Sequence, residues 1–185
     1  MVSKLPITLE LARYEDAARL ALMARHLVEA GLPWSWTTPR IVQQLRRRDT
    51  VVVVARTGKR RVVGFAILRC GFENAHLLLL AVKPGYRRQG IGQQLLAWVE
   101  HTARTAGVAR IHLEVRATNR EAQTFYAALG YRMVERVPGY YQRREAALKL
   151  VHYLRLVDPD LVPRLDLEAL FSSGSAGSAG PANPS

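Results

Sequence analysis

The segment from residue 77 to residue 96 limits the fold of this chain more than any other part of the sequence. It begins with the apolar run Leu77–Val82, continues through a short basic loop that contains Gly90 and Gly92, and then places apolar residues at helical spacing. A buried strand that passes through a glycine-containing loop into an amphipathic helix is the first half of a strand–helix–strand crossover. Since residues 110–116 form the next alternating run, we predict a parallel pair of strands joined by a right-handed connection.

The other segments alternate between strand-like and helix-like patterns. Alternating or β-branched runs predict strands at residues 7–12, 50–56, 61–70, 76–82, 110–116, 131–137 and 147–156. Apolar residues at helical spacing predict helices at residues 16–30, 91–106 and 119–129, and a short helix that begins at Pro39 with Thr38 as its N-cap. The chain shows no internal repeat. The pattern therefore predicts a mixed α/β domain.

Composition and charge narrow the class of protein. The chain has 185 residues, of which 49% are apolar, and no apolar run approaches the roughly 20 residues that a membrane-spanning helix needs. Its start carries no secretory signal, and its lone Cys70 can form neither an internal disulfide nor a cysteine-rich metal site. We therefore expect a cytoplasmic protein without a metal or a membrane contact. The net charge of +12 favours polyanions, but the arginine clusters lack interleaved aromatic residues, so we do not expect direct binding of nucleic acid.

The basic loop between the predicted strand and helix has the features of a pyrophosphate site. A helix N-terminus offers unpaired N–H groups and the positive end of the helix dipole, and Arg87 and Arg88 add charge. Gly90 and Gly92 let a phosphate approach the backbone. Two other nucleotide motifs do not fit, because Leu95 stands where a dinucleotide fingerprint needs its third glycine and because the Gly-Lys-Ser/Thr run of a P-loop is absent. An ordinary glycine-rich turn would leave the arginines and glycines unexplained together.

Two motifs carry a resemblance to a known family. They read Leu80-Ala-Val-Lys-Pro, followed shortly by Arg-Arg-Gln-Gly-Ile-Gly-Gln93, and Leu113-Glu-Val-Arg-Ala-Thr-Asn119. Residues 5–155 resemble the GNAT acetyltransferase superfamily, and within it the RimI-type ribosomal-protein alanine N-acetyltransferases. The resemblance implies a GNAT fold, with a mostly antiparallel sheet flanked by helices and a bulge in the strand before the loop, and it implies acetyl-CoA as cosubstrate. The residues that it implies as cofactor contacts are Leu80, Ala81, Val82, Arg87, Arg88, Gln89, Gly90, Ile91, Gly92, Gln93 and Asn119.

The same resemblance implies a pair of acid–base residues. Acetylation of an amine needs a neutral amine and a proton for the departing thiolate. RimI-type enzymes use a glutamate at the position of Glu114 as the base and a tyrosine at the position of Tyr126 as the acid. The alternatives are an ion pair between Glu114 and a nearby arginine, and simple ring packing by Tyr126. His76 and His112 are further candidates for proton carriers, although histidines in strands are more often structural.

The acceptor amine is predicted from weaker similarities. Trp34 and the pair Tyr140-Tyr141 match substrate-binding positions of RimI-type enzymes, although packing of aromatic rings over a sheet edge explains them nearly as well. The chain departs from that group at Ala146, where an acidic residue is expected. Three interpretations follow: acetylation of a protein or peptide N-terminus, with a ribosomal protein among the candidate acceptors; acetylation of a small-molecule amine; or a non-catalytic module that binds acyl-CoA or nucleic acid. The presence of both acid–base residues argues against the third.

The chain is expected to divide into three segments. Residues 1–156 form the predicted acetyltransferase domain, residues 157–171 a short surface helix, and residues 172–185 a tail rich in serine, glycine, alanine and proline. The tail has no large apolar side chains to bury, so it should be disordered.

Removal of the residues after Phe171 should therefore leave stability and activity unchanged, because the tail contributes nothing to the core. The melting temperature and the acetyl-transfer rate of the truncated chain, compared with those of the full chain, test this. A loss of either would mean that the tail is docked on the domain.

Overall fold

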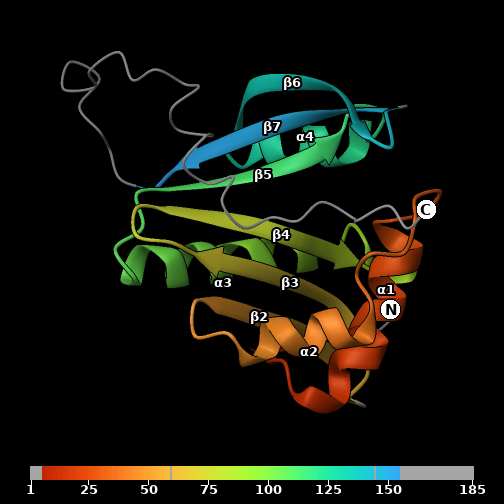
Figure 1. Ribbon diagram of the computed structural model, residues 1–185. Helices are drawn as coiled ribbons and strands as arrows, with labels where there is room; N and C mark the ends of the chain where they lie inside the picture. Colours follow the sequence, from red (N-terminus) through yellow and green to blue (C-terminus); the bar gives the residue numbers. More distant parts are fainter. Residues whose placement is uncertain (1–5, 59, 144, 155–185) are drawn as a thin grey trace. The chain divides into compact units, whose positions relative to one another are not determined.

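The computed structural model describes residues 6–58, 60–143 and 145–154, which form one mixed sheet with helices on both faces (Figure 1). The strands are β1 (Ile7–Leu11), β2 (Thr50–Thr57), β3 (Val62–Cys70), β4 (Asn74–Val82), β5 (Arg110–Arg116), β6 (Arg132–Tyr141) and β7 (Glu145–Tyr153). The helices are α1 (Ala17–Leu27), α2 (Thr38–Arg46), α3 (Ile91–Thr105) and α4 (Arg120–Ala128), with 3-10 turns η1 (Tyr14–Asp16) and η2 (Pro84–Tyr86). The spatial order of the strands is β1-β2-β3-β4-β5-β7-β6. Within the described residues only β4 and β5 pair in parallel, so the predicted mixed α/β fold with one parallel crossover is confirmed.

Two apolar clusters hold the helices to the sheet. Helices α1 and α2 pack on one face, in front in Figure 1, and α3 and α4 pack on the other. The central strands supply both clusters because successive side chains of a strand point to opposite faces. In β2, for example, Val53 contributes to the α3 side and Val54 to the α1 side. The buried stripe of α3 recurs at four-residue spacing and consists of Ile91, Leu95, Val99 and Ala103.

The parallel pair of β4 and β5 is short, and beyond it the strands are no longer paired. Its register joins Asn74 to Arg110, Ala75 to Ile111 and His76 to His112. No further pair follows in the described chain, although β4 continues to Val82 and β5 continues to Arg116. Each strand keeps its other neighbour, β3 or β7, over this stretch. The sheet therefore opens between the C-terminal halves of β4 and β5.

A bulge in β4 lies just beyond the last parallel pair. Ile67 of β3 pairs with Leu79 and Leu68 pairs with Leu77, which leaves Leu78 as an extra residue. A bulge increases the local twist and bends its strand, and bulges are frequent next to active sites. The bulge implied by the family resemblance is present at this place.

Some element boundaries differ from the prediction. Helix α1 ends at Leu27 instead of residue 30, because the chain turns before Gly31, which has a left-handed φ of 78°. The N-cap of α2 is Thr37, so Thr38 is its first helical residue. Within the described residues, no helix is both long enough and apolar enough to cross a bilayer.

The C-terminal strands also differ. Strand β6 runs to Tyr141 instead of ending at Val137, and it passes through Pro138 and Gly139. An edge strand tolerates proline because its outer side needs no hydrogen-bond partner, and β6 pairs only with β7. The predicted end of the domain at residue 156, the helix at 157–171 and the tail at 172–185 lie outside the described residues.

Gly64 of β3 permits a close contact between α3 and the sheet. A Cβ atom at this position would lie 3.0 Å from Cδ1 of Leu95 and 3.2 Å from the carbonyl oxygen of Ala81. The carbonyl belongs to the backbone of β4 and cannot yield without moving that strand. The helix that follows the basic loop is therefore seated against β3 and β4 through a glycine.

Replacement of Gly64 by alanine should destabilise the fold by about 1–3 kcal/mol, the usual cost of adding atoms to a packed interior. Gly85→Ala is the matched control, since a Cβ atom there meets no atom within 4 Å. Denaturant unfolding of both variants measures the difference. Equal free energies of unfolding would contradict the close contact.

Candidate active site

The basic loop between β4 and α3 has the backbone of an anion site. Gly90 is the N-cap of α3 with a left-handed φ of 78°, and Arg88 is also left-handed, with a φ of 58°. The N–H of Gln94 donates to the carbonyl of Gly90. The N–H groups of Ile91, Gly92 and Gln93 precede this bond and have no acceptor within the helix, so they are available to an anion.

Two arginines of the loop form ion pairs with Glu121 of α4. Nη1 of Arg87 lies 3.4 Å from Oε2 of Glu121, and Nη2 of Arg88 lies 3.5 Å from Oε1. Nε of Arg87 also donates to the carbonyl oxygen of Val82 at 3.1 Å, which ties the loop to the end of β4. Arg88 is largely exposed, and an exposed pair at this distance contributes little to stability. A phosphate group can therefore replace Glu121 as the partner of Arg88 at low cost.

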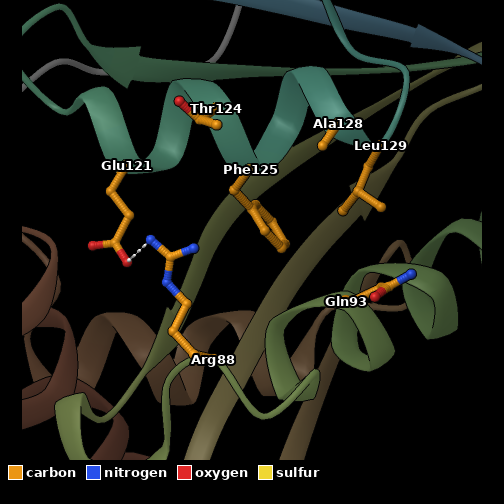
Figure 2. Close-up of a pocket in the computed structure, with 7 residues that line it drawn as sticks. All are labelled: Arg88, Gln93, Glu121, Thr124, Phe125, Ala128 and Leu129. Atoms are coloured by element: carbon orange, nitrogen blue, oxygen red, sulfur yellow. Dashed lines mark ion pairs between the residues drawn. The ribbon is translucent and has the colours of Figure 1, made fainter.

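A cavity of about 240 Å³ lies between the loop and α4 (Figure 2). Phe125 lines it from α4, Leu129 from the C-cap of that helix and Gln93 from α3, and the Arg88–Glu121 ion pair borders it. The ring of Phe125 extends from α4 toward α3 (Figure 2) and would lie 3.4 Å from a Cβ atom at Gly92. An apolar wall next to a basic loop suits a ligand that carries both phosphates and apolar groups, as acetyl-CoA does.

The predicted acetyl-binding residues Leu80, Ala81 and Val82 form the end of β4 beside the opening in the sheet. Backbone N–H and C=O groups that face this opening have no strand partner across it in the described chain. Buried backbone groups are nearly always satisfied by some partner, and an extended ligand can pair with a strand edge as an added strand does. The amide-containing arm of acetyl-CoA fits this requirement.

Glu114 lies at the inner end of the opening and is bonded to a histidine. Nε2 of His76 lies 2.6 Å from Oε2 of Glu114, and the His76 ring stacks on His112 with 4.3 Å between ring centroids. Burial by itself raises the pKa of the Glu114 carboxyl, but the hydrogen bond from His76 and the influence of His76, His112 and Lys149 lower it by more. The net pKa lies below the usual value, so Glu114 is ionised at neutral pH. Burial and the charge of His76 lower the pKa of His112 to about 4, so His112 is neutral there.

Tyr126 is buried on the inner side of α4. Its ring meets Phe125 and Tyr131 edge to face, at 5.1 Å and 5.3 Å between centroids, and only 7% of the residue is exposed. Burial raises the pKa of its phenol, so the hydroxyl keeps its proton at neutral pH. Ring packing by Tyr126, the alternative to a role as acid, therefore does occur. Its phenol is also protonated, which is the state that a general acid requires. No hydrogen bond joins Tyr126 to Glu114 in the described structure, so their cooperation stays a prediction.

The loop that carries Trp34 is organised by a buried carboxylate. Glu29 accepts hydrogen bonds from the N–H and hydroxyl of Ser35 and from the N–H of Trp36. The indole N–H of Trp34 donates to the carbonyl of Trp36, and Arg40 covers the Trp36 ring at 4.3 Å. The loop therefore has a fixed shape, in which Trp34 remains partly exposed.

Arg116 links this loop to the tyrosine pair. Its Nη1 donates to the carbonyl of Ala30 at 2.7 Å, its Nε donates to Glu145 of β7 at 2.7 Å, and its guanidinium lies 6.0 Å from the centre of the Tyr141 ring. Burial, followed by the charge of Glu114, raises the pKa of Tyr140, and that charge contributes at Tyr141 as well. Tyr140 and Tyr141 therefore lie beside the end of β5, close enough to the predicted base for its charge to affect them, and Arg116 bonds the segment that leads to Trp34.

Other predicted contacts have local roles. Oδ1 of Asn119 accepts the N–H of Ala122 and caps α4, and the side chain of Gln89 donates to the carbonyl of Gly85. Sequence reasoning missed Glu29 and Glu121 as organisers of the site, since a single acidic residue gives no signal until its partner is known. In the described part of the chain, no group of three or more His, Cys, Asp or Glu side chains is placed to hold a metal ion.

The match to a protein family decides the class of this enzyme. Residues 20–131, more than half of the chain, match the family described as "Acetyltransferase (GNAT) family". The chain belongs to the GNAT acetyltransferase family. It is therefore an N-acetyltransferase with acetyl-CoA as its cosubstrate, and the predicted resemblance is confirmed.

Individual relatives agree with this assignment. The chain is 30% identical over 118 residues to the [Ribosomal protein bS18]-alanine N-acetyltransferase of Escherichia coli K12, covering 64% of this chain and 78% of that protein. It is 30% identical over 133 residues to the enzyme of the same name from Haemophilus influenzae, covering 70% and 85%. The crystal structure of the ribosomal-protein-S18-alanine N-acetyltransferase from Escherichia coli shares the fold with a TM-score of 0.71, at 24% identity, over 85% of this chain and 100% of that one.

Replacement of Gly90 by valine should weaken acetyl-CoA binding about tenfold or more, since it forces a branched residue into the left-handed region beside the free N–H groups. Gly31→Val is the control for backbone strain, because Gly31 has the same φ of 78° and lies outside the loop. Isothermal titration of acetyl-CoA into both variants provides the measurement. Unchanged affinity in Gly90→Val would refute the phosphate site.

Proposed function

We propose that this enzyme acetylates the N-terminal amine of a protein or peptide in the cytoplasm, with ribosomal proteins as the candidate acceptors. The observation that carries the proposal is the position of Tyr140 and Tyr141 beside the end of β5 near Glu114, together with the bond by which Arg116 holds the segment that leads to Trp34. Aromatic side chains flanking an open strand edge suit a peptide, which offers both backbone groups and side chains. The names of the Escherichia coli and Haemophilus influenzae relatives, which act on ribosomal protein bS18, support the same class of acceptor.

The charges around this edge favour a peptide over a polyamine. Glu29 is bonded to the loop, Glu114 to His76, Glu135 to Lys149 and Glu145 to Arg116. A polycationic acceptor needs several carboxylates that are free to pair with it. Because Glu29, Glu135 and Glu145 are already paired and Glu114 is the proposed base, recognition by shape and aromatic contact is the better supported mode.

Glu114 and Tyr126 are proposed as the acid–base pair. Bound acetyl-CoA supplies a thioester whose carbonyl carbon forms the new C–N bond while its C–S bond breaks. Glu114, held ionised, accepts one proton from the acceptor amine directly or through a water molecule. Tyr126, which keeps its proton at neutral pH, donates one proton to the leaving thiolate. One proton lost and one gained balance the transfer.

Glu114→Gln and Tyr126→Phe should each lower kcat on the order of a hundredfold, the usual contribution of one proton-transfer group. Affinity for acetyl-CoA should be preserved, since most of the proposed cofactor contacts lie at residues 80–93. The substitutions Glu15→Gln and Tyr14→Phe, in the exposed turn η1, are chemically matched controls. Rates within about threefold of wild type in both active-site variants would reject the pair.

The acceptor class is tested separately with a panel of N-terminal peptides, polyamines and free amino acids. We expect the highest kcat/KM for peptides with a free N-terminus. Faster acetylation of polyamines or amino acids would instead identify a small-molecule acetyltransferase.

A further inference from the structure

His76 occupies the point at which the two central strands part. It forms the last pair of the β4–β5 ladder, opposite His112, and the extra residue Leu78 follows two positions later. Its side chain remains 31% exposed, whereas that of Glu114 is 16% exposed. The side chain of His76 therefore extends from β4, at the point where β4 and β5 separate, to the carboxylate of Glu114 on β5.

The hydrogen bond between the two side chains has a defined direction. An ionised carboxylate can only accept hydrogen bonds, so the proton in the 2.6 Å contact belongs to Nε2 of His76. A charge-assisted bond of this length fixes both partners more strongly than a neutral one. Stacking on His112, at 4.3 Å between centroids, also restricts rotation of the His76 ring. Within the described chain, no hydrogen bond engages the other oxygen of Glu114, Oε1.

We propose that His76 is a positioning residue for the catalytic base: its Nε2–H holds Oε2 of Glu114 and leaves Oε1 to take the proton of the acceptor amine. The inference rests on the proposed role of Glu114 and deepens it. The proton moves from the amine nitrogen to Oε1, while the Nε2–H bond of His76 stays intact. The unit that accepts the proton is thus a bonded pair contributed by two strands.

The surroundings of Glu114 predict what the loss of His76 does. Lys149 of β7 stands opposite Glu114 in the strand register and is itself paired with Glu135 at 2.7 Å. His112 lies on the same strand, and Tyr140 and Tyr141 approach from β6. Burial raises the pKa of Glu114, and the bond from His76 is the largest influence that lowers it. Without His76, burial should dominate, the pKa should rise, and Glu114 should become a base only at higher pH.

The test compares His76→Leu, which removes the donor, with His76→Gln, which keeps an N–H donor on a side chain of similar length. His101→Leu, on the exposed side of α3, is the control. In His76→Leu, the acidic limb of the kcat/KM profile should move upward by about one pH unit or more, and His76→Gln should restore part of the shift. The carboxyl carbon resonance of Glu114, titrated without acetyl-CoA, should move in the same direction.

Several results would overturn this role. Unchanged titration of Glu114 in His76→Leu would show that His76 does not act on the carboxylate. An acidic limb that disappears in His76→Leu but survives in Glu114→Gln would make His76 itself the base. If His76→Leu does not fold, nitrogen NMR spectra of the His76 imidazole in the wild-type protein provide the test. A proton on Nδ1 and none on Nε2 would show that His76 does not donate to Glu114. If the enzyme does not acetylate peptides but the Glu114 resonance still shifts in His76→Leu, only the proposed class of acceptor is rejected.

Discussion

The separation of β4 from β5 is the constraint on which the rest of the structure depends. Three parallel pairs hold the strands together, and past His76 and His112 each strand continues with only its outer neighbour. An open edge inside a sheet leaves polar backbone groups without partners, so it is tolerated only where other interactions keep the flanking strands in place. The two apolar clusters provide these interactions, because α3 fixes β4 on one face and α1 and α2 fix β3 and β4 on the other. We propose that acetyl-CoA pairs with this open edge.

The place where β4 and β5 separate also explains why Glu114 can be buried there in its ionised form. A carboxylate removed from water is costly unless it is bonded, and the partner must come from a neighbouring strand. The last pair of the ladder brings His76 beside β5, where its ring reaches Glu114 two residues beyond its own register partner. Lys149, across β5 in the register of β7, adds a positive charge from the other side. The sheet topology thus sets the protonation state of the proposed base.

The parts of the fold and the site that could be predicted from the sequence are those whose pattern lies within one segment of the chain. Residues 110–116 alternate strictly and form β5 with the predicted limits, and the helical spacing after Gly90 gives α3 to within one residue. Strand β6 was predicted too short because Pro138 and Gly139 usually interrupt strands, and only its position at the sheet edge permits them. Glu114 could be named from its motif. Its bond to His76 could not, since that contact joins two residues 38 positions apart and depends on the register of their strands.

Strand β5 connects the cofactor side of the site to the acceptor side through three alternating residues. His112 supports the His76 ring, Glu114 is the proposed base, and Arg116 bonds both the loop after α1 and Glu145 at the start of β7. Because side chains two positions apart on a strand share a face, these functions are separated by one fixed spacing of about 7 Å along the strand. A shift of β5 by one residue would turn all three side chains into the core. The antiparallel pairing with β7 covers the whole length of β5 and prevents this shift. The pairing on one edge of β5 therefore sets the geometry of a site that opens on its other edge, toward β4.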